Sequence, residues 1–157
     1  MTDRKPPRLC ASEAETLLAL LQFQRESLIR KVDGVDEVAA RQSPVGSGTT
    51  LLWLLKHLAQ AETRWVQIRF AGLNPVLPDD TVRPDDTIAS AIAGYRGATV
   101  QSDSIARTAG LDDPCRGDDG SEPVNLRWVL AHLLEETARH AGHADILREL
   151  IDGSTGR

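Results

Sequence analysis

Apolar residues recur at every third or fourth position in four separate segments, and this pattern constrains the fold more than any other feature of the sequence. Such spacing is typical of amphipathic α-helices that bury one face. Capping residues precede the segments and glycines follow them, whereas the alternation typical of β-strands is missing from the sequence. We expect four helices, over residues 12–32, 50–70, 86–109 and 126–151.

The connections between these helices are long and polar. Residues 73–84 contain three prolines, which a helix interior does not tolerate, and residues 112–123 are rich in Asp, Gly and Pro. Connections of this length allow the chain to cross from one end of a bundle to the other. The sequence therefore predicts a single all-α domain over residues 1–157, a four-helix bundle with at least one crossover loop.

Charge and composition exclude several classes of protein. The 18 basic residues are scattered and are outnumbered by 23 acidic ones, so nucleic acid is not expected as a partner. The apolar stretches are far shorter than the roughly 20 residues of a membrane span, so no membrane association is expected either. Cys10 and Cys115 are expected to be free thiols in a reducing cytoplasm, and Arg116 could lower the pKa of its neighbour Cys115.

The fourth helix carries an unusual set of polar residues on the face that should meet the core. At about 100° per residue, His132, Glu136, His140 and His143 all lie on that face. An unpaired carboxylate in a core costs several kcal/mol, so Glu136 needs a partner. A divalent cation would be one, because Glu136 and His140 are one helical turn apart and can reach the same ion.

His57 strengthens this interpretation, because it lies beside the apolar stripe of the second helix. All four histidines of the chain are thus expected to face the bundle interior, although histidine is only intermediate in its tendency to be buried. Two ordinary explanations remain open. A single inward histidine can be a hydrogen-bonded core residue, and Glu136 could pair with Arg64 or Arg139 instead of a metal.

Two stretches resemble helices of the DinB/YfiT-like superfamily. Residues 50–62 are similar to its second helix and residues 133–149 to its last helix, with the actinobacterial mini-circle branch the most similar. The resemblance implies a four-helix bundle of up-down-down-up topology. It also implies a divalent metal held by three side chains, at positions that are His57, Glu136 and His140 here. The family more often has two histidines on the last helix, and a glutamate there resembles the mycothiol-dependent maleylpyruvate isomerases.

The resemblance also implies that the protein is a metal-dependent enzyme that uses a low-molecular-weight thiol. Mycothiol is the expected co-substrate, since 15 Arg against 3 Lys suits a high-GC actinobacterial source. Zinc is the expected metal, with nickel, manganese or iron as alternatives. The thiol would attack a small electrophile as an S-transferase or isomerase does. His132 and His143 lie outside the three matched positions, and we expect either His143 or His132 to accept the thiol proton as the catalytic base.

Other readings of the same residues remain open. Two histidines and a carboxylate are also the ligand set of non-haem iron oxygenases. A non-catalytic metal-binding or stress-response protein is a further alternative, which a site without an adjoining pocket would favour. A homodimer is expected because Leu52, Trp53 and Leu55 lie off the main apolar stripe of their helix; a wide core would explain them equally.

Overall fold

Four α-helices make up most of the computed structural model, which describes residues 4–155. The helices are α1 Glu13–Val32, α2 Leu51–Glu62, α3 Ile88–Ala106 and α4 Leu126–Asp152. A 3₁₀ turn, η1 (Ala39–Arg41), precedes α2, and a π-helix, η2 (Thr63–Phe70), continues it. Within the described residues no β-strand is present, so the expectation of an all-α fold is confirmed.

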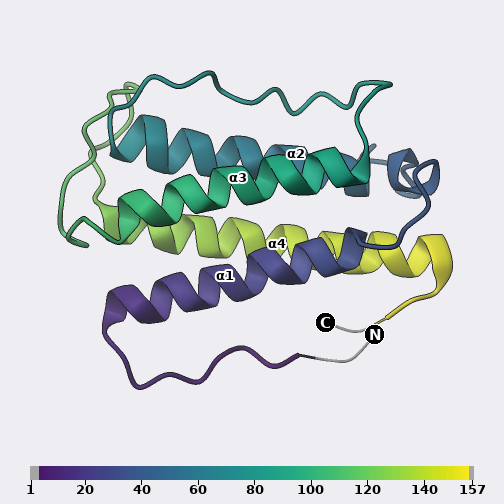
Figure 1. The fold of residues 1–157 in the computed structure, drawn as a ribbon, viewed down its shortest axis with the longest axis horizontal. Helices are drawn as coiled ribbons and strands as arrows, with labels where there is room; N and C mark the ends of the chain where they lie inside the picture. The colour runs from purple at the N-terminus through teal and green to yellow at the C-terminus, as the bar shows by residue number, and fades with distance from the viewer. Residues whose placement is uncertain (1–3, 156–157) are drawn as a thin grey trace.

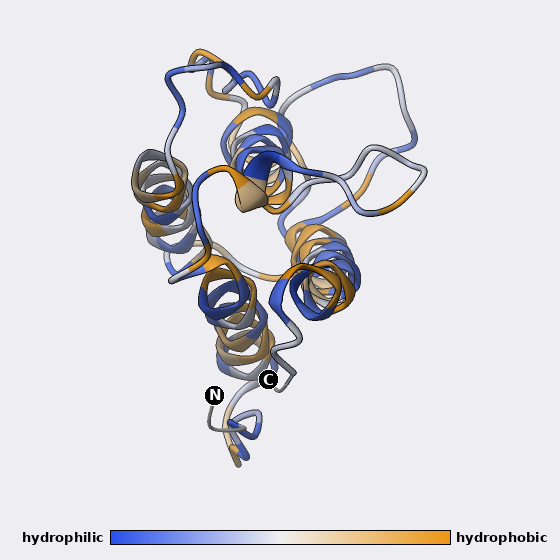
Figure 2. Ribbon diagram, turned by 90° about the vertical axis from the view of Figure 1, so that its right-hand side faces the viewer, coloured by the Kyte–Doolittle hydropathy of each residue, from blue (hydrophilic) through white to orange (hydrophobic). Residues whose placement is uncertain are grey.

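The long connections place the helices in two closely packed pairs. α1 packs mainly against α4, and α2 packs mainly against α3. Residues 71–87 run along the length of the bundle between η2 and α3, so this connection is a crossover (Figure 1). The view along the bundle in Figure 2 shows that every helix carries both hydrophilic and hydrophobic residues. This is the amphipathic pattern expected of helices that share one core.

Side chains before each helix determine where the helix begins. Ser12 and Glu15 form a capping box at α1, and the side chains of Thr50 and Asn125 cap α2 and α4. Thr87 caps α3, which therefore begins at Ile88, two residues later than expected. α3 also ends at Ala106, three residues earlier than the sequence predicts.

The second predicted helix is continuous but changes type partway along. The backbone is α-helical to Glu62 and then widens into the π-helix η2, and the sequence analysis did not predict this change. Hydrogen bonds in a π-helix reach five residues back, as the bond from the Ala71 N–H to the Val66 carbonyl does at 2.9 Å. The widened turns carry Arg64 and Trp65, two residues that line the cleft described below.

The core is wider than one stripe of each helix. Leu52 and Leu55, the residues that suggested a dimer surface, are completely buried, and Trp53 is partly buried. A wide core therefore explains both leucines within one chain, and the homodimer stays a prediction without their support. No helix in residues 4–155 combines the length and apolar character needed to cross a membrane.

Candidate metal centre

The three predicted ligands converge where α2 faces α4. One ligand atom each of His57, Glu136 and His140 lies within 4.8 Å of the others. Glu136 Oε1 is 3.2 Å from His57 Nε2 and 3.9 Å from His140 Nε2. Two ligands that are each about 2.1 Å from a tetrahedral ion are about 3.4 Å apart. The donor spacing therefore fits a single small cation, and two imidazoles with a carboxylate form a donor set that suits one.

His57 is fixed from two directions. Its ring stacks on Trp53, one turn earlier on α2, with ring centroids 4.6 Å apart and planes inclined by 17°. Its Nδ1 lies 3.2 Å from Oδ2 of Asp80, a residue of the 71–87 connection. A carboxylate at Nδ1 favours the tautomer with the proton on that nitrogen, which leaves the Nε2 lone pair for a ligand.

Glu136 is half-buried and has histidines rather than arginines as its partners. His57 meets one carboxylate oxygen, and His132 Nε2 lies 3.1 Å from the other. The expected alternatives, pairing with Arg64 or Arg139, are wrong. Arg139 pairs with Glu135 on the exposed face of α4, and the Arg64 guanidinium faces Gln60 at 3.5 Å.

The surroundings shift the pKa values of the two candidate ligand histidines in opposite directions. The hydrogen bond to Glu136, helped by Asp80, raises the pKa of His57 above its usual 6.5. Burial, together with the nearby His57 charge, lowers the pKa of His140 to about 4. The same hydrogen bond from His57 lowers the pKa of Glu136, although burial opposes it. At neutral pH, His140 is therefore a neutral imidazole and Glu136 is a carboxylate, and of the two imidazoles His57 is the one whose protonated form the surroundings favour.

The remaining two histidines lie on different sides of this cluster. His132 stacks on Trp128, with centroids 4.9 Å apart, and meets the edge of Trp65 at 4.6 Å. His143 is exposed, with its Nδ1 3.4 Å from Nδ1 of His140. The expectation that all four histidines face the interior is thus wrong for His143. At that end of α4 the buried positions are those of Ala141, Ala144, Leu147 and Arg148.

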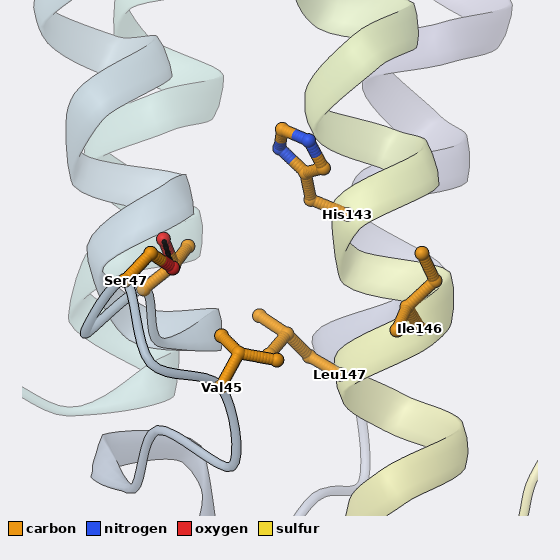
Figure 3. Close-up of a pocket in the computed structure, with 6 residues that line it drawn as sticks. Val45, Ser47, His143, Ile146 and Leu147 are labelled. Carbon is orange, nitrogen blue, oxygen red and sulfur yellow. Dashed lines mark hydrogen bonds between the residues drawn. The ribbon is translucent and has the colours of Figure 1, made fainter.

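Two concavities flank the cluster. The first is a cleft of about 420 Å³ whose lining includes the three donors. The other residues that line this cleft are Gln60, Ala61, Arg64, Trp65, His132, Glu135 and Arg139. The second is a more apolar pocket of about 320 Å³, between the segment before α2 and the second half of α4. Figure 3 shows His143 above Ile146 and Leu147 on one wall of this pocket, opposite Val45 and Ser47.

The cysteines lie away from the cluster. Both are free, and Cys10 is exposed. Burial raises the pKa of the Cys115 thiol, and the nearby Arg69 opposes this only in part. The suggestion that Arg116 activates Cys115 is therefore wrong, and neither thiol belongs to the candidate centre.

Two residues of the site were not identified from the sequence. Trp53 was expected in the core or at an interface, although its position four residues before His57 on one helix is a signal that the two rings could meet. The position of Asp80 in the sequence gives no sign that it lies beside His57. It is one of four aspartates between residues 79 and 86, and only the folded connection brings this one to His57.

Comparisons with known proteins address the family and the fold separately. A family model described as Mycothiol-S-transferase matches residues 16–153. Among solved structures, a conserved protein from Enterococcus faecalis is similar, with a TM-score of 0.68 and 16% identity over 92% of this chain and 100% of that one. At that identity the likeness concerns the fold alone. No curated protein matches the chain.

Proposed function

Because the chain belongs to the Mycothiol-S-transferase family, we propose that it is a metal-dependent enzyme that uses a mycothiol-type thiol to modify a small electrophile, as an S-transferase or isomerase. The family match includes all the candidate ligands. The observation that carries the proposal is the convergence of two imidazoles and a carboxylate in the wall of an open cleft. An adjoining cleft is what a catalytic site needs and a purely structural site does not.

In this proposal one divalent ion, zinc in the first instance, is held by His57 Nε2, a carboxylate oxygen of Glu136 and His140 Nε2. Three protein ligands leave at least one position open, as in catalytic rather than structural zinc sites. A bound cation would supply charge that favours the thiolate form of the co-substrate at neutral pH.

The protein residues have separate roles in the proposed reaction. His132 lines the same cleft as the three donors, and we assign it as the base that accepts the proton of the thiol. The thiolate sulfur then forms a bond to the electrophilic carbon of the substrate, and the electron pair of the bond that breaks, either to a leaving group or in the attacked double bond, is taken up by the atom at its other end. The proton held by His132 is returned to that atom. His143 faces the other pocket and contacts His140, so it orients that ligand rather than meeting the thiol. We assign Arg64, which lines the same cleft, to polar groups of the co-substrate.

The proposal also includes the order of the helices, the oligomeric state and the location in the cell. The up-down-down-up order of the helices agrees with the crossover by residues 71–87 (Figure 1). A homodimer would cover the exposed Ile146 and Leu150, one turn apart on α4. A cytoplasmic location suits the free Cys10 and Cys115 and a co-substrate that must stay reduced.

The direct test of function is a screen of zinc-loaded and metal-free protein with mycothiol, bacillithiol and glutathione against a panel of electrophiles. We expect turnover only when metal and thiol are both present. Glutathione should be a poor substitute, because the binding of a larger thiol depends on contacts remote from its sulfur. Rates equal to those of the metal-free protein throughout the panel would overturn the enzymatic proposal.

A further inference from the structure

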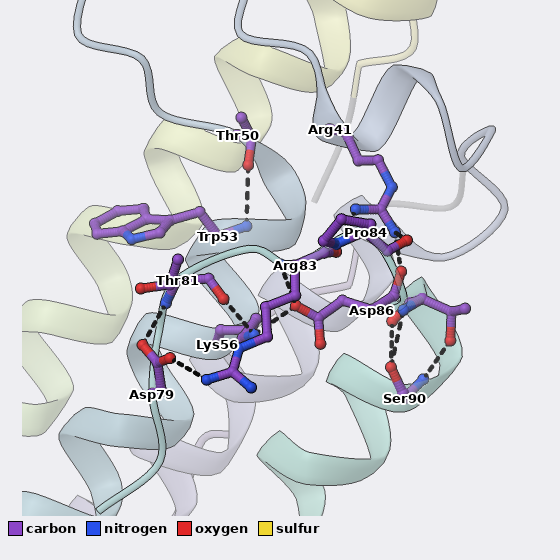
Figure 4. Close-up of polar contacts among 11 residues, drawn as sticks. Arg41, Thr50, Trp53, Lys56, Asp79, Thr81, Arg83, Pro84, Asp86 and Ser90 are labelled. Carbon is purple, nitrogen blue, oxygen red and sulfur yellow. Dashed lines mark hydrogen bonds and ion pairs between the residues drawn. The ribbon is translucent and has the colours of Figure 1, made fainter.

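The connection between η2 and α3 is hydrogen-bonded to two side chains of α2, Lys56 before His57 and Gln60 after it. We call residues 78–86 the strap. The Gln60 side chain donates to the Pro78 carbonyl at 2.8 Å, and Lys56 Nζ donates to the Thr81 carbonyl at 2.5 Å. Lys56 also meets Oδ2 of Asp86 at 2.5 Å. The strap is thus tied to α2 just before and just after Asp80. Figure 4 shows the bonds of Lys56 to Thr81 and Asp86.

Bonds within the strap give it a defined shape. Asp79 accepts from the Thr81 N–H at 2.9 Å and from the Arg83 guanidinium at 2.8 Å. Asp86 accepts from the Arg83 N–H at 2.7 Å. Figure 4 shows that Lys56 of α2 joins this network, because it donates to the same Asp86 carboxylate. A residue between such anchors has little freedom, so its side chain can be held in one direction.

The side chain held in this way is that of Asp80. Its Oδ2 lies 3.2 Å from Nδ1 of His57, whose other nitrogen faces Glu136. We propose that Asp80 is a positioning residue of the metal centre: it accepts a hydrogen bond from the Nδ1–H of His57 and so directs the Nε2 lone pair to the ion. This inference rests on the proposed function, because it assigns His57 as a ligand.

A purely structural role for this contact predicts a different outcome. The Asp80 and His57 side chains are 29% and 24% exposed, and an ion pair so open to water contributes little to stability. By contrast, removal of the partner that orients a histidine ligand typically weakens metal binding 10- to 100-fold. Metal affinity, rather than thermal stability, therefore separates the two roles.

The test compares zinc affinity, by competition with a chromophoric chelator at pH 8, in wild type, Asp80→Asn and Asp85→Asn. Asp85 is an exposed carboxylate of the same strap, so its variant makes the same change of charge away from His57. We expect a loss of about 10- to 100-fold in Asp80→Asn, a change below about threefold in Asp85→Asn, and equal melting temperatures. Equal affinities in all three proteins, or equal losses in the two variants, would overturn the role of Asp80 while leaving the metal site intact. A wild type without affinity for zinc would instead overturn the proposed function and this inference with it.

A second measurement needs no variant. Nitrogen NMR of the zinc-loaded wild type should place the His57 proton on Nδ1 and the metal on Nε2. The opposite tautomer would contradict the proposal even if Asp80→Asn failed to fold.

Discussion

At the scale of single residues, the centre depends on the way that one carboxylate and two imidazoles share protons. His57 faces a carboxylate at each ring nitrogen, and this raises its pKa. Metal and proton therefore compete for His57 Nε2. His140 does not compete in the same range, because its pKa is lowered to about 4.

Metal binding should consequently release one proton and not two. At about pH 6, below the raised pKa of His57, zinc binding should displace about one proton, and the affinity should fall about tenfold for each further unit of acidification. Above that pKa the number released should fall toward zero. Calorimetry in two buffers of different ionisation enthalpy measures the number. Two protons would mean that His140 is also protonated, and none at pH 6 would mean that His57 is not a ligand.

The sequence identifies the three candidate ligands better than it identifies the residues around them. Helical spacing predicts that Glu136 and His140 share a face and that His57 faces the interior, and the resemblance groups the three as ligands. Their convergence depends on how α2 and α4 pack, which the spacing within either helix does not contain. Asp80 could not be predicted, because a loop has no periodicity from which to infer a neighbour. His143 was misplaced because a 100° wheel puts it beside His140, whereas the core takes Ala144.

At the scale of secondary-structure elements, caps and glycines predict the helices to within about three residues. The π-helix Thr63–Phe70 was not predicted, since its residues suit an α-helix equally well and the wider turns depend on tertiary packing. The strap was expected only as a loop. Its order comes from side chains of α2 and of η1. Lys56 of α2 meets the Thr81 carbonyl and Asp86. Arg41 of η1 donates to the backbone carbonyls of Arg83, Pro84 and Asp86.

We predict that Lys56→Met loosens the strap without unfolding α2. The variant loses both bonds of the ammonium group while keeping a side chain of similar length. Hydrogen–deuterium exchange of residues 78–86 should become faster, and exchange within Leu51–Glu62 should stay slow. Lys56→Arg, which retains a cationic donor, is the matched control and should exchange more nearly like wild type. Unchanged exchange of the strap in Lys56→Met would show that Lys56 does not hold it.

At the scale of the whole molecule, ion pairs that the sequence analysis did not predict join the helices. Arg25 of α1 is 1% exposed and lies 2.7 Å from both Glu62 of α2 and Asp103 of α3. Lys31 of α1 pairs with Asp145 of α4. Both basic residues lie in a helix read mainly for its leucines, and their partners are distant in sequence, so periodicity alone does not reveal the pairs.

Removing one member of the buried group should destabilise the bundle strongly. Arg25→Met leaves the Glu62 carboxylate buried without its partner, so the free energy of unfolding should fall by about 3–5 kcal/mol. Arg96→Met removes a comparable pair with Glu26, in which Arg96 is 54% exposed, and should cost about 1 kcal/mol or less. Urea denaturation of the two variants checks the difference. Equal costs would mean that burial does not decide the value of these pairs.

The central claim is that this bundle holds one divalent ion through His57, Glu136 and His140. Its most direct test is elemental analysis of protein equilibrated with zinc and freed of excess, for wild type, Glu136→Gln and Glu135→Gln. Glu135 lines the same cleft but pairs with Arg139, so its variant makes an identical change one residue away. We predict about one zinc per chain in wild type and Glu135→Gln, and a large loss in Glu136→Gln. Zinc absent from wild type, or fully retained in Glu136→Gln, would contradict the account.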